Sequence, residues 1–209
     1  MRIAVIGAGT AGSALGRAAV RAGHHVHLSA LRPDRARAVA HDIGATPAAN
    51  NVVAVEHAEL VVLMVPAVVA PFVAAEIAPA LAGAVVVDAT NPLDETCSDL
   101  AIEGTSGAEA VQRAAGSAPV VKAFNTILAA RYAAPSENGR PLQVHIAGDD
   151  ETARRVVGDF ARSLGFAPLD VEGLRFARSL EEMAFLNITL NATRGWSWQT
   201  AWQLVGPMA

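Results

Sequence analysis

Short runs of aliphatic residues alternate with longer, alanine-rich segments along the first 125 residues of the chain. Uninterrupted aliphatic runs are typical of parallel strands that helices cover on both faces. We expect strands near residues 3–6, 25–29, 45–47, 60–65, 85–89 and 119–123. Amphipathic spacing between them predicts helices near 12–22, 33–43, 51–58, 67–81 and 106–115. The alternation predicts an α/β fold, a doubly wound Rossmann parallel sheet.

The pattern changes after residue 125. Further strands are expected at 142–147 and 167–171, a helix at 150–164, and mostly helix from 175 to 204. We therefore predict an NADP-binding Rossmann domain over residues 1–140, with a small C-terminal extension of strands and helices over 141–209 packed on it. Trp196, Trp198 and Trp202 stand at helical offsets, so we expect them to anchor a core, the wall of an acceptor site, or the interface of a homodimer.

Composition narrows the class of protein. Hydrophobic residues make up 52% of the chain and charged residues 17%, which is typical of a globular protein. A net charge of -4 provides no broad cationic surface for nucleic acid. The single Cys97 predicts a reducing compartment, and a strand that starts at Arg2 leaves no room for a leader peptide, so we expect a cytoplasmic protein. The uncharged stretch 60–75 is short and interrupted by prolines, which argues against a membrane span.

The segment from Gly7 to Gly12 is a complete G-x-G-x-x-G motif between a predicted strand and a predicted helix. Gly7 allows a tight turn, Gly9 lets the backbone approach a pyrophosphate, and Gly12 lets helix and strand pack closely. Free N–H groups at the start of the helix suit an anion. The motif in this setting predicts a dinucleotide site.

The end of the second strand favours NADP over NAD. An NAD-binding chain usually places Asp or Glu there to hold the ribose hydroxyls. This chain instead has Ser29 followed by Arg32 and Arg35, and a hydroxyl with guanidinium groups suits a 2′-phosphate. The competing interpretation is that both arginines are solvated charges at the start of a helix.

The ends of three further strands are expected to line the cofactor cleft, because ligands of open parallel sheets bind at the carboxyl ends of the strands. Lys122 stands in one of them and is either a proton donor or a surface lysine. We assign no catalytic residue and no metal site. The expected cofactor-binding residues are Gly7, Ala8, Gly9, Thr10, Ala11, Gly12, Ser29, Ala30, Leu31, Arg32, Arg35, Val65, Pro66, Ala67, Asn91, Pro92, Ala123, Phe124 and Asn125.

The chain resembles the coenzyme F-420-dependent NADP oxidoreductase family, in segments that match in order from residue 1 to about residue 180. They are 2–12, 65–66, 88–93, 120–126 and 147–150, and a later segment at 164–170 is also similar. The resemblance implies an enzyme that binds NADPH along these turns and a deazaflavin, coenzyme F-420, near the C-terminal helices. In such a pair a hydride passes directly between the two rings, so positioning supplies the catalysis.

Two alternatives remain open beside this interpretation. One is an NADPH-dependent reductase of a flavin or a small carbonyl compound that uses no F-420. The other is a non-catalytic module that binds a dinucleotide and senses its redox state.

Overall fold

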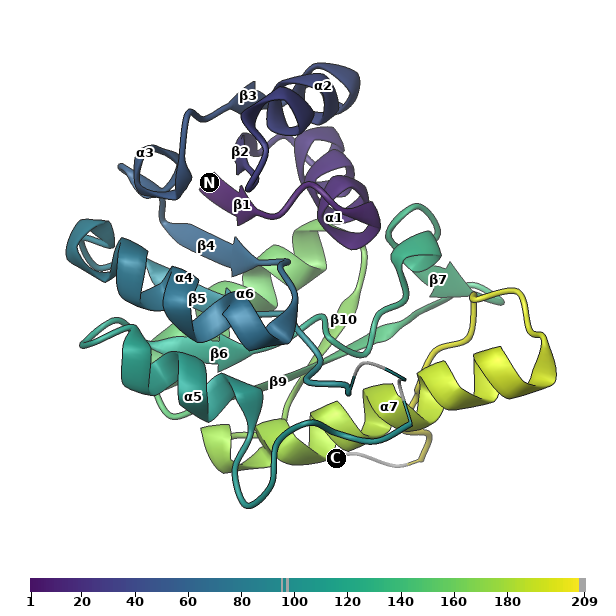
Figure 1. The fold of residues 1–209 in the computed structure, drawn as a ribbon. Helices are drawn as coiled ribbons and strands as arrows, with labels where there is room; N and C mark the ends of the chain where they lie inside the picture. The colour runs from purple at the N-terminus through teal and green to yellow at the C-terminus, as the bar shows by residue number, and fades with distance from the viewer. Residues whose placement is uncertain (95, 97, 207–209) are drawn as a thin grey trace.

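A computed structural model describes residues 1–94, 96 and 98–206; Cys97 lies outside the described residues. Its main element is an eight-stranded sheet with the order β10-β9-β6-β5-β4-β1-β2-β3 (Figure 1). The first six strands along the chain run parallel, β9 runs antiparallel to β6, and β10 runs parallel to β9. This topology confirms the predicted doubly wound Rossmann sheet. The strands are β1 (Arg2–Ile6), β2 (His25–Ser29), β3 (Thr46–Pro47), β4 (Leu60–Leu63), β5 (Val85–Asp88), β6 (Val120–Lys122), β9 (Gln143–Gly148) and β10 (Ala167–Asp170).

Helices cover both faces of the sheet, and each face has its own hydrophobic cluster. Leu15, Ile43 and Phe160 bring α1 (Thr10–Arg21), α2 (Pro33–Ile43) and α6 (Glu151–Ser163) onto one face. Val55, Ile77 and other residues bring α3 (Asn51–Val55), α4 (Ala70–Ile77) and α5 (Gly107–Ala114) onto the opposite face. The long α7 (Ala177–Arg194) runs beside α5 and β9 (Figure 1). Four short 3-10 turns and a small hairpin complete the fold, namely η1 (Ala67–Val69), η2 (Ala78–Ala80), η3 (Ala129–Tyr132), η4 (Leu174–Phe176), β7 (Ser136–Glu137) and β8 (Arg140–Pro141).

Local sequence explains where several helices begin and end. Ser106 and Glu109 form a reciprocal capping box at the start of α5, and Asp150 accepts a hydrogen bond from the N–H of Ala153 at the start of α6. Pro33 opens α2, where its missing N–H costs nothing, and Gly44 closes that helix in the left-handed conformation that glycine adopts readily. These signals fix where each helix begins or ends, and so they fix the lengths of the loops that join the helices to the neighbouring strands.

The C-terminal segment differs from the sequence prediction. The prediction of helix up to residue 204 was wrong beyond Arg194, because Gly195 adopts a φ of +63° and ends α7. The segment that carries the three tryptophans is irregular instead. Trp202 donates from its ring nitrogen to the carbonyl of Met183 at 2.8 Å, and the side chain of Gln143 pairs with both backbone groups of Leu204. Polar contacts thus tie the tail back onto α7 and β9.

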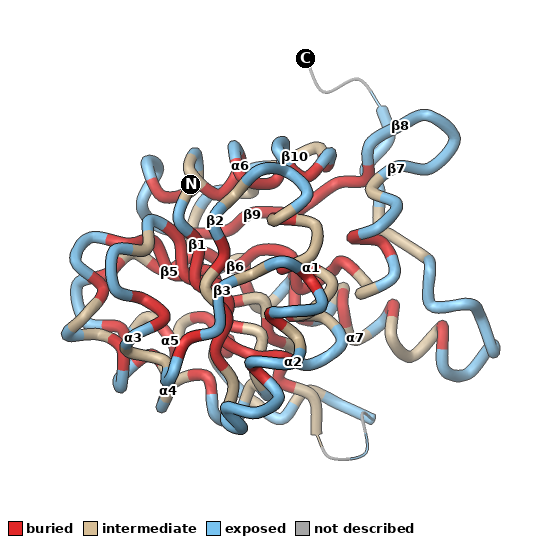
Figure 2. The backbone as a smooth tube through the Cα atoms, turned by 90° about the horizontal axis from the view of Figure 1, so that it is seen from above, coloured by how far each residue is buried: buried red, intermediate tan, exposed pale blue. Residues whose placement is uncertain are grey.

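The strands form the buried centre of the molecule, and the exposed backbone lies mainly on the outer sides of the helices and on the loops (Figure 2). Within the described part of the chain, no helix combines the length and the apolar character needed to cross a lipid bilayer.

A substitution of Phe160 tests the part of the core that joins α6 to the sheet. Its ring is fully buried and makes edge contacts with the rings of Phe124 and His24. Phe160→Ala should therefore lower the free energy of unfolding by about 3–5 kcal/mol, the usual cost of emptying such a site. Urea denaturation provides the measurement. Phe72→Ala is the matched control, because that ring is exposed on α4 and its loss should change stability by no more than about 0.5 kcal/mol.

Candidate functional site

The glycine loop lies between the end of β1 and the start of α1. Gly7 adopts a φ of +122°, and a Cβ there would collide with the backbone of Met64, just beyond β4. A Cβ on Gly12 would collide with the carbonyl oxygen of Gly7. Close packing therefore requires both glycines, in the roles that the motif predicts.

Gly9 differs from the other two glycines of the motif. A Cβ built on it meets no atom within 4 Å, so the space beside it is open. Gly9 is also the N-cap of α1, and no side chain caps that helix end. Exposed N–H groups at the positive end of a helix, with open space beside them, fit a pyrophosphate.

Ser29 at the end of β2 and Arg35 near the start of α2, two of the expected cofactor residues, both contact the loop. The backbone N–H of Gly7 donates to the carbonyl of Ser29, and Arg35 donates from Nε to the carbonyl of Ala8 at 2.8 Å. The Ser29 side chain is fully buried, however, and its hydroxyl donates to Asn51 at 2.8 Å. Its hydroxyl proton is therefore already committed within the fold.

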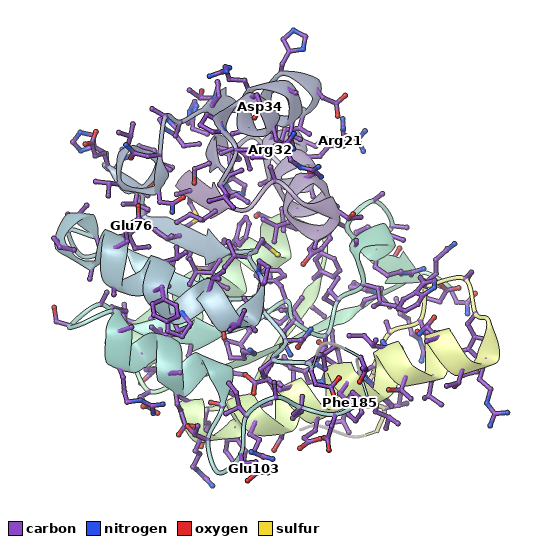
Figure 3. The ribbon with its side chains drawn as sticks, viewed as in Figure 1. Arg21, Arg32, Asp34, Glu76, Glu103 and Phe185 are labelled. Carbon is purple, nitrogen blue, oxygen red and sulfur yellow. The ribbon has the colours of Figure 1, made fainter. Side chains whose placement is uncertain are left out.

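Arg32 lies at the start of α2 with its side chain largely exposed, next to Asp34 (Figure 3). The two charged groups are 3.3 Å apart. Leu31, the residue before Arg32, is completely exposed. An exposed ion pair contributes little stability, so Arg32 is available for an anionic ligand at little cost to the fold.

A cavity of about 420 Å³ lies where the chain leaves β4 and β5. Four of the expected cofactor residues line it: Pro66, Ala67, Asn91 and Pro92. The rest of its wall is mostly apolar, and the carboxylate of Asp94 in that wall accepts hydrogen bonds from Thr96 and Ser98. A larger hollow of about 630 Å³ at the opposite edge of the sheet contains none of the expected cofactor residues. The cavity at the carboxyl edge is the better candidate, because open α/β sheets bind their ligands at that edge.

The two residues that follow β6, Ala123 and Phe124, turn their side chains into the core. The side chains of Ala123 and Phe124 are buried in the core, where the Phe124 ring contacts those of Tyr132, Phe160 and Phe166. Their side chains therefore serve packing, and only their backbone is left for a cofactor. Phe124 has a φ of +64°, an unusual conformation for a bulky residue that often marks a functional site.

Asn125, which follows Phe124, pairs with Asn91 across the ends of β5 and β6. Asn91 donates from Nδ2 to the carbonyl of Asn125 at 2.9 Å, and Asn125 donates from Nδ2 to Oδ1 of Asn91 at 3.0 Å. The same Asn125 nitrogen donates to the carbonyl of Leu180 on α7 at 2.9 Å. Two amides from separate strand ends are thus held in one arrangement.

Lys122 is not on the surface, so the surface-lysine interpretation of the sequence is wrong. Its side chain is completely buried. Its Nζ donates to Asp88 at 2.9 Å, to Glu181 at 2.7 Å and to the carbonyl of Thr90 at 2.7 Å. These contacts explain how a charged side chain is accommodated in the interior. Burial raises the pKa of Glu181 above the ordinary carboxyl value, although Lys122 acts in the opposite direction.

Three buried side-chain atoms next to these groups find no hydrogen-bond partner within the described residues. They are Oγ1 of Thr90, Oδ1 of Asn125 and Oγ1 of Thr126. An unpartnered buried polar atom is costly, and so each requires an explanation. All three belong to the turns that follow β5 and β6, but their residues are buried and are not among those that line the cavity beside Asn91.

Sequence reasoning missed Glu181 and Asn51. Glu181 occupies the buried face of α7 together with Leu180, Ala184 and Asn187, a helical spacing that places a carboxylate among core positions. That position was a readable signal of a buried charge in need of a partner. Asn51 gave no such signal, because its role depends on contacts with Ser29 and Glu76 that only the fold brings together.

Comparisons with known proteins agree with this geometry. The family model described as "NADP oxidoreductase coenzyme F420-dependent" matches residues 2–92. A solved structure from Arthrobacter sp. FB24, designated an F420-dependent NADP-reductase, is 27% identical with a TM-score of 0.83, and the match covers 93% of this chain and 95% of that one. A hypothetical protein from Sinorhizobium meliloti, SMa0349, is 30% identical with a TM-score of 0.76, over 85% of this chain and 88% of that one.

A curated relative matches over a shorter region. Metalloreductase STEAP3 of Rattus norvegicus is 39% identical over 102 residues, which are 48% of this chain. The match spans only 20% of the length of that relative.

The sheet order, the glycine loop and the uncapped helix start define a protein of the dinucleotide-binding Rossmann class. Within that class, the chain belongs to the coenzyme F420-dependent NADP oxidoreductase family.

The contrast between Gly9 and Gly12 gives a test of the loop. Gly12→Ala should lower the free energy of unfolding by about 1–3 kcal/mol, because its methyl group meets the Gly7 carbonyl in a packed turn. Gly9→Val should cost less, about 0.5–1 kcal/mol, because open space surrounds that position and only the preference of a helix N-cap for glycine over valine is lost. Chemical denaturation of both variants measures the difference. Equal losses of stability would contradict the assigned packing.

Proposed function

We propose that this protein is an NADP(H)-dependent oxidoreductase that exchanges a hydride between NADPH and a second organic ring, with the deazaflavin of coenzyme F-420 as the leading acceptor. The observation that carries the proposal is the open space beside Gly9 at the uncapped start of α1, on the same sheet edge as the cavity lined by Asn91. NADPH supplies the hydride when it is bound. The protein binds and orients the reactants, which is sufficient catalysis for a direct transfer between rings.

The residues suggest which part of the cofactor each strand end holds. The loop of residues 7–12 is assigned the pyrophosphate, and Arg32 and Arg35 the 2′-phosphate. The turns after β4, β5 and β6 are assigned the nicotinamide half, because they lie across the sheet from β2. Asn91 and Asn125 supply the amides at that end.

An organic ring as acceptor is supported by the apolar wall of the cavity. Apart from Asn91 and Asp94, its lining residues are prolines and aliphatic side chains, and the Asp94 carboxylate is occupied by its own loop. Such a wall favours an uncharged, largely apolar reacting group. A deazaflavin, a flavin and a small apolar carbonyl compound each carry such a group, and a comparison of acceptors separates them.

NADPH oxidation in the presence of F-420, of FMN and of a small aldehyde provides that experiment. We expect turnover with F-420 to exceed turnover with the other acceptors. Gly9→Val should abolish both turnover and NADPH binding in a folded protein, because its side chain fills the space of the pyrophosphate. Binding of NADPH with no turnover on any acceptor would favour the sensor module instead. Unchanged NADPH affinity in folded Gly9→Val would refute the cofactor site.

Cofactor choice gives a second test. Arg32→Ala should weaken NADPH binding by about tenfold to a hundredfold, equivalent to about 1.5–3 kcal/mol for a lost bond to a charged group. NADH affinity should change little, because NADH lacks the 2′-phosphate. Arg37→Ala, an exposed arginine further along α2, is the control. Isothermal titration with both cofactors measures the effect, and equal losses for the two would show that Arg32 does not read the phosphate.

A further inference from the structure

Glu181 connects α7 to the interior of the Rossmann sheet, although it lies far along the chain from all of the expected cofactor residues. Its side chain is 1% exposed. One carboxylate oxygen accepts from Lys122 at 2.7 Å, and the other accepts from the backbone N–H of Gly107 at 3.2 Å. Both oxygens are therefore engaged, and neither contact is with solvent.

The network extends from Glu181 to the turn after β5. Lys122 holds the carbonyl of Thr90 at 2.7 Å, and Asp88 accepts the N–H of Thr90 at 3.0 Å. Both backbone groups of Thr90 are thus fixed by buried charged side chains. The next residue is Asn91, which lines the cavity.

A second connection leads from α7 to the same place. Asn125 donates to the carbonyl of Leu180, the neighbour of Glu181, and to the side chain of Asn91. The Asn91–Asn125 pair is therefore held from one side by Thr90 and from the other by α7. A shift of α7 relative to β6 would disturb both connections.

We propose that Glu181 is a positioning residue for the nicotinamide half of the cofactor, acting through Lys122 and Thr90 on the Asn91 and Asn125 amides. This inference rests on the proposed function, since it takes the two amides to contact NADP(H). The purely structural alternative is that Glu181 only neutralises a buried ammonium. The two differ in one respect: a positioning residue affects one end of the cofactor, whereas a general loss of structure affects both.

The test compares two ligands on wild type, Glu181→Gln and Glu181→Ala. Adenosine 2′,5′-bisphosphate carries only the adenosine half of NADPH, with its 2′-phosphate. We expect Glu181→Ala to weaken NADPH binding at least about tenfold, the equivalent of a lost hydrogen bond, with the affinity for the bisphosphate within about twofold of wild type. Glu181→Gln keeps the size and an acceptor atom, so it should retain part of the affinity for NADPH.

Two controls make the comparison specific. Glu182→Gln removes the neighbouring, exposed carboxylate of α7 and should leave both affinities unchanged. The double variant Glu181→Gln with Asn91→Ala should weaken NADPH less than the product of the two single effects, because residues that act through one another are not additive.

The outcomes separate the hypotheses. The positioning role would be overturned if the Glu181 variants bound NADPH and the bisphosphate with equally reduced affinity, or both with unchanged affinity. Independent effects of the two substitutions in the double variant would also overturn it. If Glu181→Ala does not fold, Glu181→Gln gives the same comparison. Failure of wild type to bind NADPH at all would instead refute the proposed function, and this inference with it.

Discussion

The buried ammonium of Lys122 is the interaction on which the arrangement of this molecule depends. It has no water to solvate it, so Asp88, Glu181 and the carbonyl of Thr90 must replace that solvent. The partners come from β5, from the turn that follows it, and from α7. Removing one partner of a buried ion pair typically costs about 3–5 kcal/mol, because it leaves the other charge uncompensated. Lys122 therefore ties the C-terminal helix to the centre of the sheet.

This constraint also bears on how the C-terminal extension is joined to the carboxyl edge of the sheet. β9 and β10 continue the sheet beyond β6, while α7 reaches the end of β6 through the hydrogen bonds of Glu181 to Lys122 and of Leu180 to Asn125. Strand pairing alone would fix β9, but it would leave α7 free to slide along the sheet. Charged and amide contacts at a few points remove that freedom, since each demands a particular register of the helix.

Much of the fold was predictable from the sequence because its signals are local. The aliphatic runs, the glycine loop and the capping residues act within a few positions of themselves, and they gave strands and helices close to those observed. Gly195 is an equally local signal for the end of α7, but the prediction of helix up to residue 204 did not take it into account. The prediction of a longer helix failed for that reason.

The site was less predictable, because its decisive contacts are not local. Helices cover both faces of β6, so alternation along the strand shows which face Lys122 joins but not which charged groups meet it there. Its partner Glu181 lies 59 residues further along the chain. The hydroxyl of Ser29 was expected to hold a phosphate, yet it donates to Asn51, which lies 22 residues further along the chain. Phe124 stands in a matching motif, but its ring is needed in the core.

The two ends of the proposed cofactor site are built from different kinds of interaction. Near the end of β2, the side chain of Arg32 is exposed and forms an ion pair with Asp34. An exposed ion pair contributes little stability, so a substitution of Arg32 should cost the fold little. At the ends of β5 and β6, the amides depend on buried charges whose loss costs several kcal/mol. The choice between NADP and NAD can therefore vary without disturbing the fold. The geometry at the nicotinamide end cannot, because the contacts that position it also hold α7 against the sheet.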